Sequence, residues 1–282
     1  MKKVLTFIKK YYVEIIILIF LSILLVMSFY PLVMLFFKSF KEISDDQQNP
    51  FGIPKVWSFV NYEYAWLVIK PYFINSILIT AFQTIGIVVL GSITAFPFTR
   101  YNFPYKNVIF YGIISLMMIP GLVTLTSQYE LINNIKLVNS IWGVILPSIA
   151  GSIPFALFLL NMSFKNVSKD LMDAAEIDGA SDFQVFRHIM MPLSKPIVWT
   201  LVITSFMNSW NDYLWPSLVL LEDDKKTLPL ALVNFTNSYY DLTGGYGAPF
   251  AAYIISSLPL IILFLVASKQ FIQGLTSGSI KM

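Results

Sequence analysis

The chain has 282 residues, of which 56% are hydrophobic and only 12% are charged, and its formal net charge is +3. A soluble domain of this length would carry about a quarter charged residues, so this composition excludes an ordinary soluble protein and predicts a polytopic membrane protein. Cysteine is absent, which excludes disulfides, thiolate metal sites and cysteine nucleophiles. A single histidine, His188, argues against a histidine-clustered metal or haem site.

The first apolar run extends from about Tyr12 to Phe37 behind a basic start at Lys2 and Lys3. It is too long for the apolar region of a signal peptide and has no small-residue cleavage site at its end. We therefore expect a retained first transmembrane helix.

The sequence contains six windows that are long and apolar enough to cross a membrane. We expect an all-α polytopic protein with a single transmembrane domain over 1–282 and six spans, at about 12–37, 72–97, 107–127, 138–161, 196–220 and 249–268. Helix breakers are expected to interrupt four of these spans, at Pro120-Gly121, at Gly151 with Pro154, at Pro216 and at Pro259. Such breakers are compatible with packing kinks and with a substrate path, and the sequence leaves both open.

The distribution of cations predicts the orientation of the chain. With six spans, twelve Lys and Arg residues fall on the side that holds both termini, and seven fall on the opposite side. The positive-inside rule then predicts cytoplasmic termini. The short 97–107 connection supports this orientation, because it carries Arg100 and Lys106 and no acid. The segment 162–195 is therefore predicted to be cytoplasmic.

The cytoplasmic segment reads as two short helices joined by a glycine. Ser168 is expected to cap a helix over 169–178, which Gly179 ends in the left-handed conformation. A second helix is expected to restart at Ser181 or Asp182, to stop at Pro192, and to be followed by a span that opens at Pro196. The expected apolar face of the first helix consists of Leu171, Ala174, Ala175 and Ala180. His188 is interpreted as part of the second helix rather than as a ligand.

The composition of this loop favours a protein partner over lipid. Residues 170–182 carry five acids and no base, whereas interfacial lipid-binding helices are usually rich in Lys and Arg. The small residues Ala174 and Ala175 beside Gly179 would also allow a partner's surface to approach closely. An interfacial connector helix is the alternative, and a docking surface for a soluble cytoplasmic protein fits better.

The same loop resembles a known family motif. Asp173-Ala174-Ala175, Gly179, Ile189 and Pro192 match the spacing EAA-x3-G-x9-I-x-L-P of bacterial ABC import permeases, with Asp173 for Glu and Met191 for Leu. Other segments resemble the carbohydrate branch, the maltose-transporter-like permeases. They are NSILIT at 75–80, NFPYK at 102–106, MIPG at 118–121, ILP at 145–147, IDGAS at 177–181, PLSKP at 192–196, SWNDYLWP at 209–216, TLPL at 227–230 and QGLTSG at 273–278.

The resemblance implies a subunit of an ATP-driven sugar or oligosaccharide importer in the bacterial cytoplasmic membrane. It implies as partners a second, homologous permease, two copies of an ABC ATPase that bind ATP and Mg²⁺, an extracytoplasmic sugar-binding protein, the sugar and membrane lipid, with no nucleic acid and no cofactor in this chain. The loop 168–195 between spans four and five would dock on the ATPase through Asp173, Ala174, Ala175, Asp178, Gly179 and Ala180. Residues 273–278 resemble a tail that also approaches the ATPases.

A polar face on span five is the candidate cargo path. Thr204 and Ser205 precede a cluster that consists of Asn208, Asn211, Asp212, Tyr213 and Trp215. Ionisable residues inside spans usually face a bundle interior or a cavity, and aromatic rings beside amides and carboxylates suit a sugar. The alternative is that the aromatic rings mark the membrane interface and that Asp212 caps a helix end. The outer segments 38–71 and 221–248 would face the sugar-binding protein, or they are ordinary solvated loops.

Other functional classes fit the sequence less well. No phosphate-binding GxxxxGK[ST] sequence is present, so ATP must be hydrolysed by other chains and no enzymatic activity is expected. A self-sufficient secondary transporter would ordinarily show internal repeats and coupling carboxylates, and only Glu14 and Asp212 lie within the spans. No constellation for a membrane-embedded enzyme is seen. Within the ABC permeases, another cargo such as glycerol phosphate stays open.

Overall fold

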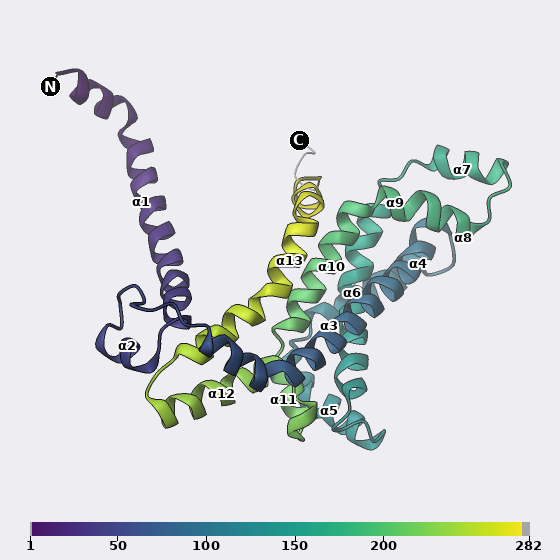
Figure 1. Cartoon of the computed structure of the whole chain (residues 1–282). Helices are drawn as coiled ribbons and strands as arrows, with labels where there is room; N and C mark the ends of the chain where they lie inside the picture. Colours follow the sequence, from purple (N-terminus) through teal and green to yellow (C-terminus); the bar gives the residue numbers. More distant parts are fainter. Residues whose placement is uncertain (1, 278–282) are drawn as a thin grey trace. The chain divides into compact units, whose positions relative to one another are not determined.

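The computed structural model describes residues 2–277, with side chains from 11 to 270 (Figure 1). Within this part of the chain every regular element is a helix and no strand is present, which confirms the all-α prediction. Residues up to Ile69 together with Leu232–Ser256 form one compact unit, and Lys70–Ala231 with the residues after Ser256 form a second one. Each unit is described separately below.

The first unit is built on helices at the two ends of the chain. Its elements are α1 (Lys2–Ser39), α2 (Ile43–Gln48), the start of α3 (Val60–Arg100), most of α12 (Leu228–Thr243) and the start of α13 (Gly247–Ser277). The segments 38–71 and 221–248, which the sequence left open as solvated loops, are therefore largely helical. Aromatic rings pack within the first of these segments: the Phe40 ring lies 5.1 Å from Trp57 and 4.9 Å from Tyr62.

The second unit holds the remaining helices. They are the later part of α3, α4 (Lys106–Ser115), η1 (Leu116–Met118), α5 (Gly121–Asn134), α6 (Ile141–Phe164), α7 (Lys169–Ile177), α8 (Asp182–Val185), the π-helical turn η2 (Phe186–Met190), α9 (Met191–Leu193), α10 (Lys195–Trp210), α11 (Leu214–Val219), η3 (Asp223–Lys225) and the end of α13. Helix α6 contacts α4, α10 and α11. The short helices α7 to α9 lie at one end of α6 and α11 at the other (Figure 1).

The candidate membrane spans are of two kinds. Four continuous helical stretches within the described residues are long and apolar enough to cross a membrane: Tyr11–Ser39, Val60–Arg100, Ile141–Phe164 and Gly247–Gln270. Two further candidates are helix pairs that bend sharply, Lys106–Met118 with Gly121–Asn134 and Asp182–Leu193 with Lys195–Trp210. The described residues therefore contain four to six candidate spans, and the count of six stays a prediction.

The break inside the predicted third span is located at Pro120. Ile119 is extended, with φ −81° and ψ 118°, and the helices on either side of the break meet at 100°. Proline disfavours the helical conformation of the residue before it and has no N–H to continue the helix. The window 107–127 is therefore bent rather than straight, as the Pro120-Gly121 pair indicated.

Of the other three expected interruptions, two are absent and one lies at a different position. Helix α6 continues through Gly151 and Pro154, and α13 continues through Pro259. In the fifth window the break falls at Asn211–Tyr213, before Pro216, which lies inside α11. Prolines inside membrane helices are tolerated where neighbouring groups bond to the carbonyls that they free, so sequence alone does not fix where a helix ends.

The apolar core of the second unit joins the spans to the loop between α6 and α10. Its buried side chains come from α3, α6, α7, α8, η2 and α10, and include Phe98, Leu157, Leu160, Phe164, Met190 and Leu201. Helices α3 and α6 approach closely at Gly91, where an added Cβ would lie 2.5 Å from the Cβ of Ala156. Small residues allow such close approach in membrane proteins.

Candidate functional site

The first loop helix forms as its sequence predicts. The hydroxyl of Ser168 accepts a hydrogen bond from the backbone N–H of Asp170, which caps the start of α7. The helix ends at Ile177, one residue before the expected end, and Gly179 follows with φ +82°. Only glycine adopts this conformation at little cost, so the turn depends on Gly179.

The second loop helix starts as expected and ends later. Ser181 and Gln184 form a reciprocal capping box at the start of α8, with their side chains bonded to each other's backbone N–H. The prediction that Pro192 stops this helix is wrong, because the chain stays helical to Leu193. The preceding π-helical turn accommodates Pro192, which has no N–H for an ordinary helical bond. A bend of 78° then separates this segment from α10.

The buried face of α7 differs from the predicted one. Met172 is the residue of α7 that is buried, while Ala175 and Ala180 are partly buried against the same core. Leu171 and Ala174, which were expected on the apolar face, are exposed, and the prediction is wrong for them. The long Met172 side chain reaches a core that short alanine side chains would not fill.

The outward surface of the loop contains most of the predicted docking residues. Asp173, Ala174, Asp178 and Gly179 are exposed, and Ile177 beside them is 87% exposed. Ile177 is not part of the apolar core, so this face carries an exposed apolar side chain. His188 is exposed within the second helical segment, in agreement with its interpretation as a helix residue.

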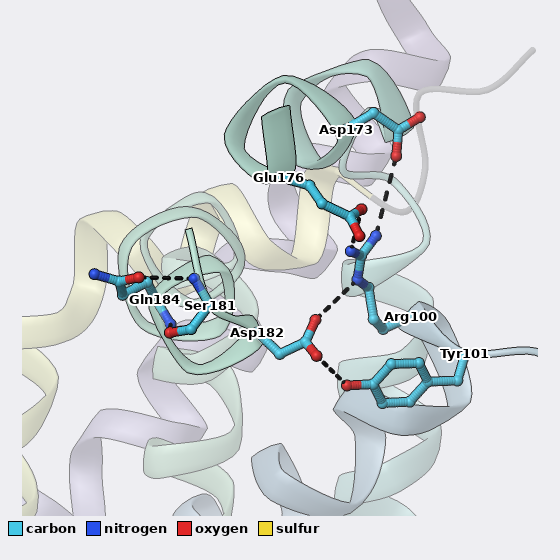
Figure 2. Close-up of polar contacts among 7 residues, drawn as sticks. All are labelled: Arg100, Tyr101, Asp173, Glu176, Ser181, Asp182 and Gln184. Carbon is cyan, nitrogen blue, oxygen red and sulfur yellow. Dashed lines mark hydrogen bonds and ion pairs between the residues drawn. The ribbon is translucent and has the colours of Figure 1, made fainter. Parts of the chain in front are cut away.

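Arg100, at the end of α3, lies among the acids of the loop (Figure 2). Its guanidinium donates from Nη2 to Glu176 Oε2 at 2.7 Å and from Nε to Asp182 Oδ1 at 3.2 Å. Asp173 Oδ1 lies 4.0 Å from Nη1. The hydroxyl of Tyr101 donates to the other oxygen of Asp182 at 2.5 Å, and this hydrogen bond raises the pKa of the tyrosine hydroxyl.

This cluster changes the interpretation of the acid-rich loop. Of the five acids in 170–182, three face Arg100 from within the same chain, and one of them is Asp173 of the motif. Sequence reasoning did not foresee this pairing, although it singled out Arg100 as a cation without a local acid. The loop keeps a negative surface, because one guanidinium balances only part of the charge of three carboxylates.

A polar cavity of about 270 Å³ lies between α3, α6 and α10. Its lining includes eight polar side chains, namely Gln83, Ser148, Ser152, Thr204, Ser205, Asn208, Ser209 and Asp212, together with Ile87, Gly151 and Phe155. Asp212 is the one ionisable group among these lining residues, and no Lys or Arg is among them. The cavity therefore offers hydroxyls, amides and a single carboxylate.

The structure separates the predicted cargo residues into two groups. Asn208 and Asp212 line the cavity, whereas Asn211, Tyr213 and Trp215 do not. Asn211 is exposed and donates from its side chain to the carbonyl of Met207 at 2.8 Å, and Tyr213 is 46% exposed. Direct contact of these three residues with cargo stays an untested prediction. The sequence analysis missed Gln83, Ser148 and Ser152, which also line the cavity. In the sequence, each of them is visible only as a polar residue within an apolar span.

Trp215 has a clear packing role. It is 6% exposed, and its indole N–H donates to the carbonyl of Gly143 at 3.1 Å. Pro147, four residues after Gly143, has no N–H for that carbonyl, so the indole provides the missing donor. Trp215 thereby satisfies a group that the proline leaves without its helical partner.

We expect Trp215→Phe to destabilise the protein and to leave transport specificity unchanged. The variant keeps the aromatic volume and leaves the Gly143 carbonyl without its donor, which costs about 1–3 kcal/mol when a buried acceptor is unsatisfied. Thermal unfolding in detergent should shift to lower temperature, while the apparent KM for cargo in vesicles should stay the same. A changed KM at unchanged stability would instead place Trp215 in the cargo path.

Comparison with known proteins identifies the family of this fold. The model of the family described as "Binding-protein-dependent transport system inner membrane component" matches residues 87–277. This chain belongs to that family. The matched range contains the whole loop and the cavity residues except Gln83. Members of this family are membrane transport components rather than enzymes.

Two curated relatives resemble the permease over most of its length. A probable ABC transporter permease protein, YurM of Bacillus subtilis, is 32% identical over 93% of this chain and 87% of its own length. The arabinooligosaccharides transport system permease protein AraQ of the same species is 34% identical over 81% of this chain and 80% of its own.

A solved structure shares the fold. It is the crystal structure of a bacterial ABC transporter involved in the import of the acidic polysaccharide alginate, with a TM-score of 0.81 and 20% sequence identity, covering 93% of this permease and 98% of the matched chain. The predicted tail contact at 273–278 lies outside the described side chains, and Gly278 lies outside the described residues.

Proposed function

We propose that this permease is the membrane-spanning subunit of an ATP-driven importer of sugars or oligosaccharides. In this proposal it forms half of the translocation pathway beside a second, homologous permease. The family match over residues 87–277 is the observation that carries the proposal. The arabinooligosaccharide permease AraQ and the alginate transporter, which this chain resembles, point to cargo of the carbohydrate class.

The loop 168–195 is proposed to dock on one of two cytoplasmic ATPase subunits. Its exposed face presents small residues at Ala174 and Gly179 beside the apolar side chain of Ile177. The acids give this face a negative charge, so a cleft with cationic side chains would complement it. ATP and Mg²⁺ would bind to the ATPases, and this chain would bind no cofactor itself.

The polar cavity is proposed as part of the cargo path, and its chemistry favours neutral cargo. Its lining residues include one carboxylate, Asp212, and no cation. A phosphate or uronate group placed there would meet a like charge without a counterion, which is unfavourable away from water. A neutral sugar would instead meet hydroxyl and amide partners. This contrast favours a neutral sugar over glycerol phosphate.

The proposed location is the bacterial cytoplasmic membrane, with six spans and both termini in the cytoplasm. The family description supports an inner-membrane component, and the excess of Lys and Arg on the predicted cytoplasmic side supports the orientation. The segments 38–71 and 221–248 would then lie outside. Their aromatic surface is proposed to meet an extracytoplasmic sugar-binding protein.

A self-sufficient secondary transporter is the rival class. Membership of a family of binding-protein-dependent components argues against it, because such components act within a larger assembly. Sodium- or proton-driven uptake by the isolated chain would favour the rival. Uptake that requires ATP, a binding protein and ATPase subunits would favour the importer.

Affinity purification in mild detergent tests the proposal. We expect an ATPase and a second permease to copurify with this chain, and the complex in vesicles to accumulate neutral oligosaccharides only when ATP is supplied. Arabino-oligosaccharides and uronate oligosaccharides of equal length provide a matched cargo pair, of which the neutral one should be preferred. Recovery of the chain without an ATPase or second permease would contradict the proposal.

A further inference from the structure

Arg100 joins the end of α3 to two loop helices that are distant from it in the sequence. It is the last residue of α3, its partners Asp173 and Glu176 lie on α7, and Asp182 is the first residue of α8 (Figure 2). The guanidinium side chain is only 14% exposed, whereas the carboxylate side chains of Glu176 and Asp182 are 63% and 47% exposed. The loop therefore covers the cation, while its acids stay in contact with solvent.

The geometry of this contact differs from an ordinary surface ion pair. Isolated exposed pairs contribute little, because water screens them and both side chains lose freedom. Here separate nitrogens of one planar group reach carboxylates on two helices, and Tyr101 holds the second oxygen of Asp182. A guanidinium suits such a shared contact, because its donors are fixed in a plane. The cluster thus fixes α7 and α8 together against the end of α3.

The chain connections of the loop are bent on either side of this cluster. Between α7 and α8 the backbone turns at Gly179, with φ +82°. Between α9 and α10 it bends by 78° at Ser194. Moreover, α7 is attached to the core by one buried residue, Met172, and one partly buried residue, Ala175. The orientation of α7 therefore depends on its contact with Arg100 more than on its covalent neighbours.

Helix α3 leads from this cluster to the polar cavity. It is one helix from Val60 to Arg100, and Gln83 and Ile87 on it line the cavity. At 1.5 Å per residue these positions lie about 20–25 Å from Arg100 along the helix. A displacement of α7 that is transmitted to Arg100 thus acts on an element that forms a cavity wall.

We infer that Arg100 is a positioning residue that fastens the loop 168–195 to α3, so that movement of the loop reaches the cavity wall. The inference rests on the proposed docking of an ATPase on this loop. The loop is covalently connected to α6 and α10 only. In this inference α3 also transmits the movement of the loop to the cavity wall, through the side-chain contacts of Arg100. Arg100 touches neither cargo nor ATP in this role.

Arg100→Gln in the assembled importer tests the inference. The substitution replaces none of the proposed docking residues, so the ATPases should still copurify and hydrolyse ATP. Transport of a neutral oligosaccharide per ATP hydrolysed should fall about fivefold or more, which is the size of an ordinary coupling between two sites. Arg100→Lys should give an intermediate loss, because an ammonium group cannot bond to both helices with the fixed geometry of a guanidinium.

Arg187→Gln is the matched control. Arg187 is an exposed cation in the same loop, in η2, and it forms no ion pair with any side chain that the structure describes. Its replacement should leave transport per ATP unchanged. Equal losses in the two variants would overturn the inference, because they would indicate a general effect of loop charge.

The absence of cysteine from the sequence allows a rescue experiment. In the Arg100→Gln background, Tyr101→Cys and Asp182→Cys provide two thiols that a short bismaleimide can join. Cross-linking should restore transport per ATP if Arg100 acts as a tie, and failure to restore it would overturn that role. A wild-type chain that recruits no ATPase would contradict the proposed function. Normal recruitment with unchanged coupling in Arg100→Gln would contradict only this inference.

Discussion

Gly179→Leu is expected to abolish ATPase association and sugar uptake. Gly179 is exposed at φ +82°, and no described atom lies within 4 Å of the position that a Cβ would take. The new side chain would therefore point away from the protein, into the space that a docked ATPase would fill. The left-handed conformation adds about 1–2 kcal/mol of local strain for a side chain with a Cβ. Copurification of the ATPase and uptake into vesicles measure the result.

Gly179→Ala separates strain from bulk. It carries the same backbone penalty as leucine and adds only a methyl group, so ATPase association should survive in large part. Thermal unfolding of the permease alone should shift by a similar amount for both variants. If leucine and alanine reduce association equally, the loss comes from a distorted turn, and close approach of a partner at Gly179 is not supported.

The local features of the loop were predictable because short-range chemistry determines them. The Ser168 cap and the left-handed Gly179 follow from residue type and position within a helix. The capping box is likewise set by residues three apart, Ser181 and Gln184. Both ends of α7 and the start of α8 therefore agree with the sequence to within one residue.

The contact of Arg100 with the loop was not predictable, because its partners lie 76 and 82 residues away along the chain. The spacing of residues along one helix carries no information on a contact between segments so far apart in the sequence.

The effect of prolines on the helices was not predictable from the sequence either. Pro147 and Pro154 do not end α6, and the Nε1–H of Trp215, distant in sequence, provides the donor for the carbonyl that Pro147 leaves free. The sequence shows that a proline leaves a backbone carbonyl without its helical donor, and only the fold shows which group donates to that carbonyl instead.

The polar cavity was predicted in part, and its role as a cargo path stays a proposal. A polar face on one helix is visible in the sequence, and Asn208 and Asp212 line the cavity accordingly. The opposite walls come from Gln83 on α3 and from Ser148 and Ser152 on α6. Each of these is a single polar group in an apolar span, which by itself is equally typical of helix–helix packing. Only the arrangement of the helices brings these polar side chains together around one cavity.

Gly151→Leu is expected to block transport while the fold is kept. Gly151 lines the polar cavity, and no described atom lies within 4 Å of the position of an added Cβ, so the side chain would extend into the cavity without displacing core residues. It would replace polar surface with an apolar group and reduce the space for cargo. Uptake should fall about tenfold or more, since ~1.4 kcal/mol of lost binding or raised barrier is sufficient for that. Initial uptake rates measure the effect.

Gly112→Leu provides the matched control for this experiment. Gly112 lies within α4, is exposed, also has no described atom within 4 Å of the added Cβ, and is not among the residues that line the cavity. Both substitutions replace a helical glycine with a good helix former, so both should leave helix stability unchanged or raise it. Because the two variants match in chemistry and differ in facing the cavity, a selective loss in Gly151→Leu assigns cargo to this cavity. Equal uptake by both variants would place the path elsewhere.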